Sequence, residues 1–289
     1  MSAWSRALGA RSVASLVASL AFAGAPTAND VVVPYAPCNG CHEEITTPFA
    51  HSPHARLGAV SCASCHGDGA KHAEQADKSL ITLPKGAAGA KTCLQCHGGE
   101  KDFTHAGTGA HATASVYCTD CHSIHAPAPN NVALLRAAAG AECARCHPSQ
   151  SKEFSKPFAH HLGRGGMSCF SCHNPHGGRG DGSLEETTAG ELPCLTCHAE
   201  KRGPFVFQHV SGEVGNCLSC HEPHGSNNPK RLIRARVDQL CLECHTTLPA
   251  GNLGSQPPSF HNLLLPRYQN CTVCHAAVHG SNSSPMLLK

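Results

Sequence analysis

The sequence predicts an elongated chain of short α-helices and irregular segments, with little or no β-sheet, folded around bound groups rather than around its own side chains. Three observations predict this fold class. A Cys-x-x-Cys-His unit occurs ten times in 289 residues and uses all 20 cysteines. Aromatic residues make up only 4% of the chain, too few for a large side-chain core. The 28 glycines and 20 prolines interrupt regular structure throughout.

Each unit carries the residues that attach c-type haem. On a helical turn the residues i, i+3 and i+4 share one face, so both thiols can bond to vinyl groups along one haem edge while the histidine reaches the iron. Zinc sites and disulfide frameworks also use paired cysteines, but neither requires a histidine after every second one. The units therefore predict ten covalent haems c and a multihaem cytochrome c fold.

The expected attachment residues are Cys38, Cys41, Cys62, Cys65, Cys93, Cys96, Cys118, Cys121, Cys143, Cys146, Cys169, Cys172, Cys194, Cys197, Cys217, Cys220, Cys241, Cys244, Cys271 and Cys274. The expected proximal iron ligands, for units 1 to 10, are His42, His66, His97, His122, His147, His173, His198, His221, His245 and His275. First cysteines of successive units lie 23 to 31 residues apart, which is typical of a repeat architecture.

Histidine is the expected second axial ligand, because the chain has 23 histidines and three methionines. After odd-numbered units one spare histidine follows 11 to 16 residues on: His54, His111, His161, His209 and His261. After even-numbered units one follows 3 to 6 residues on: His72, His125, His176, His224 and His279. This selection leaves His51, His105 and His160 over. The choices of His54 over His51, His111 over His105 and His161 over His160 stay open.

Chain length restricts the pairing of these ligands. Three extended residues reach only about 10–11 Å, less than two Cα atoms need on opposite faces of one haem. His125, His176 and His224 each follow a proximal histidine by three residues. We therefore expect these three to bind a neighbouring haem.

Residues 1–28 read as an export signal, with Arg6 and Arg11 before a small, apolar stretch. Residues 29–289 then form one decahaem domain, expected in the periplasm. No other stretch approaches 18 apolar residues, so no direct membrane span is predicted. The formal net charge is +2, but two propionates on each ferric haem would make the mature protein acidic, which argues against nucleic acid as a partner.

Two longer helices are expected, at 130–147 and 231–245, where helix-forming residues lead into the fifth and ninth units. Elsewhere glycine and proline predict loops and single turns. A short strand at 31–33 is also possible.

Three stretches are more specific than the units themselves: Cys172-His173-Asn174-Pro175-His176-Gly177, Cys220-His221-Glu222-Pro223-His224-Gly225-Ser226, and His279-Gly280-Ser281-Asn282. With the ten units, from Cys38 to about Ser284, they resemble the periplasmic decahaem cytochromes of the MtrA, PioA and DmsE type. The resemblance implies bis-histidine haems in one extended chain. It also implies either insertion into an outer-membrane β-barrel porin or electron delivery to a terminal reductase.

The favoured function is electron transfer along ten bis-histidine haems, through an outer-membrane porin and so to the cell exterior. A soluble periplasmic shuttle to other redox proteins is the alternative. A multihaem reductase is disfavoured, because the histidine supply leaves no open iron for a substrate. Assembly into a conductive filament is also disfavoured, because the sequence shows no obvious self-association segment.

The number of attached haems tests the motif count directly. Mass spectrometry of the mature protein should find ten haem additions, because ten complete units leave no cysteine unused. Eight or fewer additions in fully matured protein would contradict the prediction.

Overall fold

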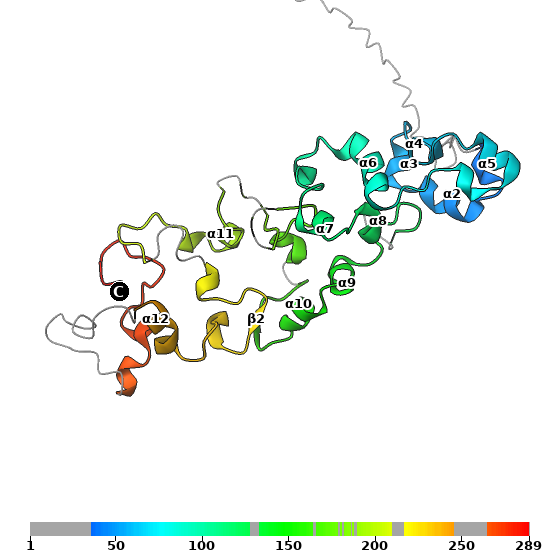
Figure 1. The fold of residues 1–289 in the computed structure, drawn as a ribbon. Coiled ribbons are helices and arrows are strands. Elements are labelled where there is room, and N and C mark those ends of the chain that lie inside the picture. Colours follow the sequence, from blue (N-terminus) through cyan, green and yellow to red (C-terminus); the bar gives the residue numbers. More distant parts are fainter. Residues whose placement is uncertain are drawn as a thin grey trace, which may run out of the picture.

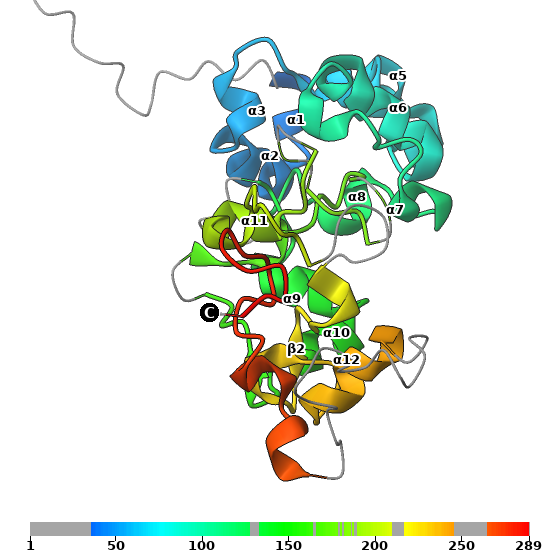
Figure 2. The same ribbon diagram turned by 90° about the vertical axis from the view of Figure 1, so that its left-hand side faces the viewer.

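The chain forms an elongated body in which sequence order follows position along the long axis. The computed structural model describes residues 36–127, 133–163, 166–178, 180, 182–185, 187, 190–209, 217–245 and 265–288. Figure 1 shows the first helices and the last helix at opposite ends, and Figure 2 shows the same separation after a 90° turn. The elongated shape agrees with the predicted fold class. The predicted export signal and the strand at 31–33 lie outside the described residues.

The helices are short, and many of them coincide with the Cys-x-x-Cys-His units. The α-helices are α1 (Ala36–Asn39), α2 (Glu43–Ala50), α3 (Pro53–Arg56), α4 (Cys62–His66), α5 (Ala70–Gln75), α6 (Gly86–His97), α7 (Ala110–Thr113), α8 (Cys118–Cys121), α9 (Ala139–Ala144), α10 (Pro148–Glu153), α11 (Cys194–Cys197) and α12 (Val237–His245). Single 3₁₀ turns cover Lys78–Leu80, Lys101–Phe103, Cys169–Ser171, Ala199–Lys201, Cys217–Ser219, Pro229–Arg231, Pro266–Tyr268 and Cys271–Val273. No helix in these ranges is long and apolar enough to cross a membrane.

The two helices predicted at 130–147 and 231–245 are both shorter in the structure. Helix α9 begins at Ala139 instead of residue 130, although residues 128–132 lie outside the described part. Helix α12 begins at Val237 instead of residue 231. The segments before both helices are occupied by tertiary backbone pairing, which overrides their helix propensity.

This pairing recurs after even-numbered units. The chain leaves the proximal histidine, turns, and returns to pair a leucine with it; the bridged pairs are His122 and Leu135, His173 and Leu184, and His221 and Leu232. At the first pair, Ser123 donates its N–H to the Leu134 carbonyl at 2.7 Å and Arg136 donates to the Cys121 carbonyl at 3.0 Å. The return segment therefore fixes the backbone around the iron-binding histidine.

Buried side chains are few. Among the described residues the buried apolar side chains are Phe49, Ala55, Leu134 and Leu135, and no large side chain is fully buried. The predicted lack of a conventional side-chain core is confirmed for this part of the chain.

Segments far apart in sequence meet in a two-stranded antiparallel sheet. Strand β1 (Phe158–Ala159) pairs with β2 (Gly225–Ser226), with Ala159 opposite Gly225. A similar isolated bridge joins Phe207 to Ser281. The backbones approach so closely at Gly225 that an added Cβ would lie 2.2 Å from the Glu153 carbonyl oxygen.

Replacing Gly225 by alanine should destabilise the protein, because the methyl group would overlap backbone that cannot move aside cheaply. We expect a loss of about 1–3 kcal/mol in the free energy of unfolding, measured by thermal or denaturant unfolding. Gly140→Ala is the matched control: it lies in α9 with nothing within 4 Å of an added Cβ and should be neutral or slightly stabilising. Equal stability of the two variants would contradict the close crossing.

Candidate haem sites

The attachment units adopt the helical turn that their chemistry requires. In seven of them the proximal histidine donates its backbone N–H to the carbonyl of the first cysteine, at 2.9–3.0 Å: His42, His122, His147, His173, His198, His221 and His275. The histidines of units 2, 3 and 9 close helices α4, α6 and α12. Both thiols and the following histidine of a unit therefore share one face.

The cysteine side chains of successive units meet in an unbroken series. First cysteines lie close together between units 1–2, 3–4, 5–6, 7–8 and 9–10, within reach of a thiol hydrogen bond: Cys38 with Cys62, Cys93 with Cys118, Cys143 with Cys169, Cys194 with Cys217, and Cys241 with Cys271. Second cysteines lie within electrostatic range between units 2–3, 4–5, 6–7 and 8–9: Cys65 with Cys96, Cys121 with Cys146, Cys172 with Cys197, and Cys220 with Cys244. Since these thiols mark haem edges, each attachment site adjoins the next in chain order.

Nine proximal histidines face a second histidine ring at a nearly constant separation. Ring centroids lie 5.9–6.5 Å apart in the pairs His42–His72, His66–His125, His97–His54, His122–His176, His147–His111, His173–His224, His198–His160, His221–His279 and His245–His209. Two metal–nitrogen bonds of about 2 Å in line, plus the ring radius on each side, give about 6 Å. The spacing fits one iron between each two rings.

The pairs follow a rule that links every second unit. A histidine following odd unit n faces unit n+2, as His111 after unit 3 faces His147 of unit 5. A histidine following even unit n faces unit n−2, as His176 after unit 6 faces His122 of unit 4. His72 is the exception among the described pairs, since it follows unit 2 and faces unit 1. The geometry agrees with the expectation that His125, His176 and His224 avoid their own units, but the unit reached is two away.

At many of these histidines the ring nitrogen Nδ1 forms a hydrogen bond, which leaves Nε2 as the nitrogen that can bind a metal. Among proximal rings it lies 2.5–2.9 Å from a backbone carbonyl in even-numbered units: His66 with Thr82, His122 with Ala133, His173 with Gly182, His221 with Lys230 and His275 with Met286. Ligating histidines usually donate their other N–H in this way, which fixes ring orientation.

Burial favours the neutral form that binds metal. It is the largest cause lowering the pKa of His54, His125, His160, His176, His209 and His279. A neutral imidazole keeps the lone pair that an iron needs. Together with the ring spacing and the thiol positions, this makes the residues present a good fit to haem c.

One distal prediction needs correction. The structure turns His160, not His161, toward His198, at 6.5 Å between ring centroids, and its Nδ1 lies 2.6 Å from the Pro223 carbonyl oxygen. His161 is exposed. The two are adjacent in an extended segment that continues from β1, so their side chains point to opposite sides. Only one of them can face the proximal ring.

At the other two open choices the predicted residue is the one whose ring faces a proximal ring. His54 and His111 face proximal rings, whereas His51 and His105 are exposed. His261 lies outside the described residues, and its assignment to an iron stays a prediction.

Phenylalanines beside the distal rings were missed from sequence. Phe49, Phe103 and Phe154 lie 6.2, 4.3 and 5.2 Å from the rings of His125, His176 and His224, respectively. The signal was present, because each follows the proximal histidine of an odd-numbered unit by six or seven residues. These aromatic rings pack against distal histidines that come from much later in the chain.

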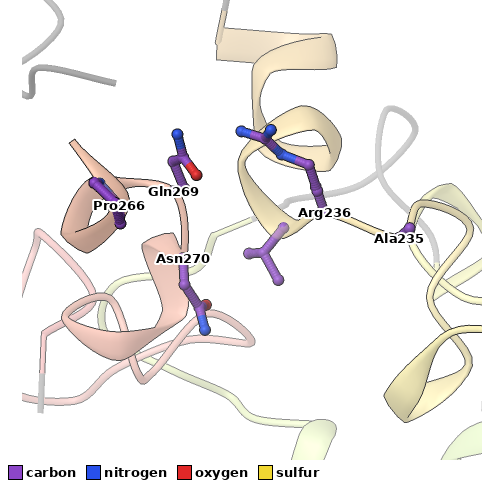
Figure 3. A pocket seen from close by; sticks show the side chains of 6 residues that line it. Ala235, Arg236, Pro266, Gln269 and Asn270 are labelled. Atoms are coloured by element: carbon purple, nitrogen blue, oxygen red, sulfur yellow. The ribbon is translucent and has the colours of Figure 1, made fainter. Parts of the chain in front are cut away.

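A small open hollow lies between the segment that leads into the ninth unit and the segment that leads into the tenth, and its volume is about 290 Å³. It is lined by Ala235, Arg236, Val237, Pro266, Gln269 and Asn270 (Figure 3). The Arg236 guanidinium pairs with Asp238, at 2.6 Å. The lining contains none of the predicted site residues, so the hollow is separate from the attachment sites.

Comparisons with known proteins agree with this geometry. The family model described as a doubled CXXCH motif matches residues 160–203 and 209–250. The chain is 32% identical over 236 residues to the multihaem cytochrome MtrA of Shewanella baltica (strain OS185), covering 78% of this chain and 69% of that protein. The chain therefore belongs to the MtrA family of multihaem c-type cytochromes, which hold haem covalently and are electron-transfer proteins, not enzymes.

Proposed function

We propose that this protein carries electrons along ten bis-histidine haems c, from the periplasm through an outer-membrane β-barrel porin to acceptors outside the cell. Residues 1–28 would direct export and residues 29–289 would form a single decahaem domain. When bound, each haem supplies one site for reversible one-electron transfer.

The observation that carries this proposal is the unbroken series of cysteine contacts. Close pairs of first cysteines alternate with pairs of second cysteines within electrostatic range from Cys38 to Cys271, so the thiols of every unit lie near those of the unit before and the unit after. Such an arrangement brings neighbouring haem edges close over the whole body. Because the chain runs from one end to the other in Figure 1, the two terminal sites are far apart.

The paired histidines support conduction rather than substrate chemistry. At each of the nine described pairs the two facing histidines would both bind the iron of one haem, which would leave no position on it for a substrate. Bis-histidine ligation also lacks the potential-raising effect of a methionine ligand, so low potentials are expected. The residues of the chain would hold and orient the haems, and burial favours the neutral form of six distal histidines by lowering their pKa.

The porin assignment rests on family membership and shape. An elongated body with terminal sites at opposite ends suits transfer across a barrier, and none of the described helices spans a membrane. A barrel would then supply the hydrophobic exterior. A freely diffusing periplasmic shuttle to a terminal reductase is the second candidate, and it needs one exposed terminal site only.

Replacing His176 by alanine should open the iron held by His122, not the one held by His173, because the His176 ring lies 6.1 Å from His122. Electron paramagnetic resonance should detect about one high-spin haem per protein, following the one-haem-per-unit rule. His105→Ala is the matched control, since that side chain is exposed, and it should show no high-spin signal. A crystal structure of the variant identifies the opened haem; an open iron at Cys169 and Cys172 would contradict the pairing.

Transfer across a bilayer tests the porin proposal. Liposomes that enclose reduced methyl viologen and contain both the cytochrome and an outer-membrane barrel protein from the same genome should pass electrons to external ferric citrate, so that the enclosed viologen is oxidised and the ferric iron outside is reduced. Barrel alone is the control for leakage. The periplasmic shuttle would be correct instead if two results are found together. Viologen oxidation is no faster with cytochrome and barrel than with barrel alone, and the soluble cytochrome passes electrons to a periplasmic reductase.

A further inference from the structure

The distal histidines of odd-numbered units share a hydrogen bond that sets their ring orientation. His111 and His160 place Nδ1 2.8 and 2.6 Å from the carbonyl oxygens of Pro175 and Pro223. His209 bonds in the same way to the carbonyl of Val278. Each acceptor stands directly before a distal histidine of the even class. The planes of these three rings lie 43°, 44° and 5° from those of their proximal partners.

His54 is the member of this series that departs from the pattern. The acceptor at the equivalent position would be the carbonyl of Ile124, which precedes His125. Yet Nδ1 of His54 is buried and makes no hydrogen bond among the described residues. Ile124 instead packs on the apolar cluster of Phe49 and Ala55. The part of the chain that the structure describes therefore supplies no Nδ1 hydrogen bond to hold the His54 ring in the orientation of its counterparts.

The opposing ring is held firmly. Nδ1 of His97 lies 2.7 Å from Glu100 Oε1, and the ring rests against Phe103 at 5.5 Å between centroids. His54 itself sits in α3, whose N-terminus is capped by the Ser52 side chain. The two ring planes cross at 87°, whereas the other eight described pairs differ by 44° or less.

We propose that the site of Cys93 and Cys96 is a crossed-ligand haem site, electronically distinct from the other described sites, with the unbonded His54 as its distal ligand and Glu100 as the positioning residue of His97. Parallel imidazole rings interact with the same iron d orbital and split the pair of π-type orbitals. Crossed rings interact with different orbitals and leave the pair nearly equal in energy. A low-spin ferric haem of the crossed kind gives a strongly anisotropic, low-field paramagnetic signal. This inference rests on the proposed bis-histidine ligation.

Electron paramagnetic resonance of the fully oxidised protein should contain one strongly anisotropic low-spin component of about one spin in ten, following one haem per unit. His54→Ala should abolish this component and add a high-spin signal of equal size. His111→Ala is the matched control: it removes the hydrogen-bonded distal ring of unit 5, so it should reduce the ordinary low-spin signal and leave the anisotropic one intact.

Glu100 supplies a second test that does not depend on removing a ligand. Glu100→Ala releases the His97 ring and should diminish the anisotropic component, while Glu100→Gln keeps an acceptor and should preserve it. Glu200→Ala, near His198 at 3.9 Å, is the control and should leave the component unchanged.

Three outcomes overturn the inference: no anisotropic component, its loss in His111→Ala instead of His54→Ala, or its survival in Glu100→Ala. Haem content and total low-spin count, measured on the same samples, separate these outcomes from a failure of the bis-histidine assignment itself.

Discussion

One constraint organises the structure: two imidazole rings must face each other about 6 Å apart across a single metal position, and the chain draws the two from different units. His66 meets His125, and His122 meets His176. Each such pair ties an earlier segment to a later one. The described residues bury few side chains, so bonds from these histidines to haem iron would take over the role of a core and would couple cofactor binding to folding.

Other backbone interactions help to orient the facing imidazole rings. Return segments pair with proximal histidines and present carbonyl acceptors to their Nδ1 atoms, as Leu135 and Ala133 do at His122. Segments of the chain cross closely at Gly225 and Gly280. A Cβ at Gly225 would overlap the Glu153 carbonyl, and a Cβ at Gly280 would overlap the Phe205 ring. An imidazole whose N–H is bonded is a stronger and better oriented ligand. The orientation of distal rings such as His111 and His160 is therefore set by carbonyl groups 64 and 63 residues later in the chain.

The series of cysteine contacts gives the arrangement its direction along the body. First cysteines approach each other between one pair of units and second cysteines lie within electrostatic range between the next, so an attachment site presents one thiol toward each neighbouring unit. A helical unit offers two thiols three residues apart, which makes this alternation available at every step. The same short motif thus anchors the haem and sets its contact with the units on either side.

The sequence by itself determined the attachment units, the helical turn within them, the elongated and nearly coreless fold, and the pool of histidines for the second axial position. Those features follow from local spacing and composition. Only the tertiary structure decided which rings meet, because a contact between units two apart leaves no trace in local spacing. It also decided between His160 and His161, since adjacent extended residues point to opposite sides, and it delayed the start of α9 and α12, where backbone pairing at Leu135 and Leu232 competed with helix formation.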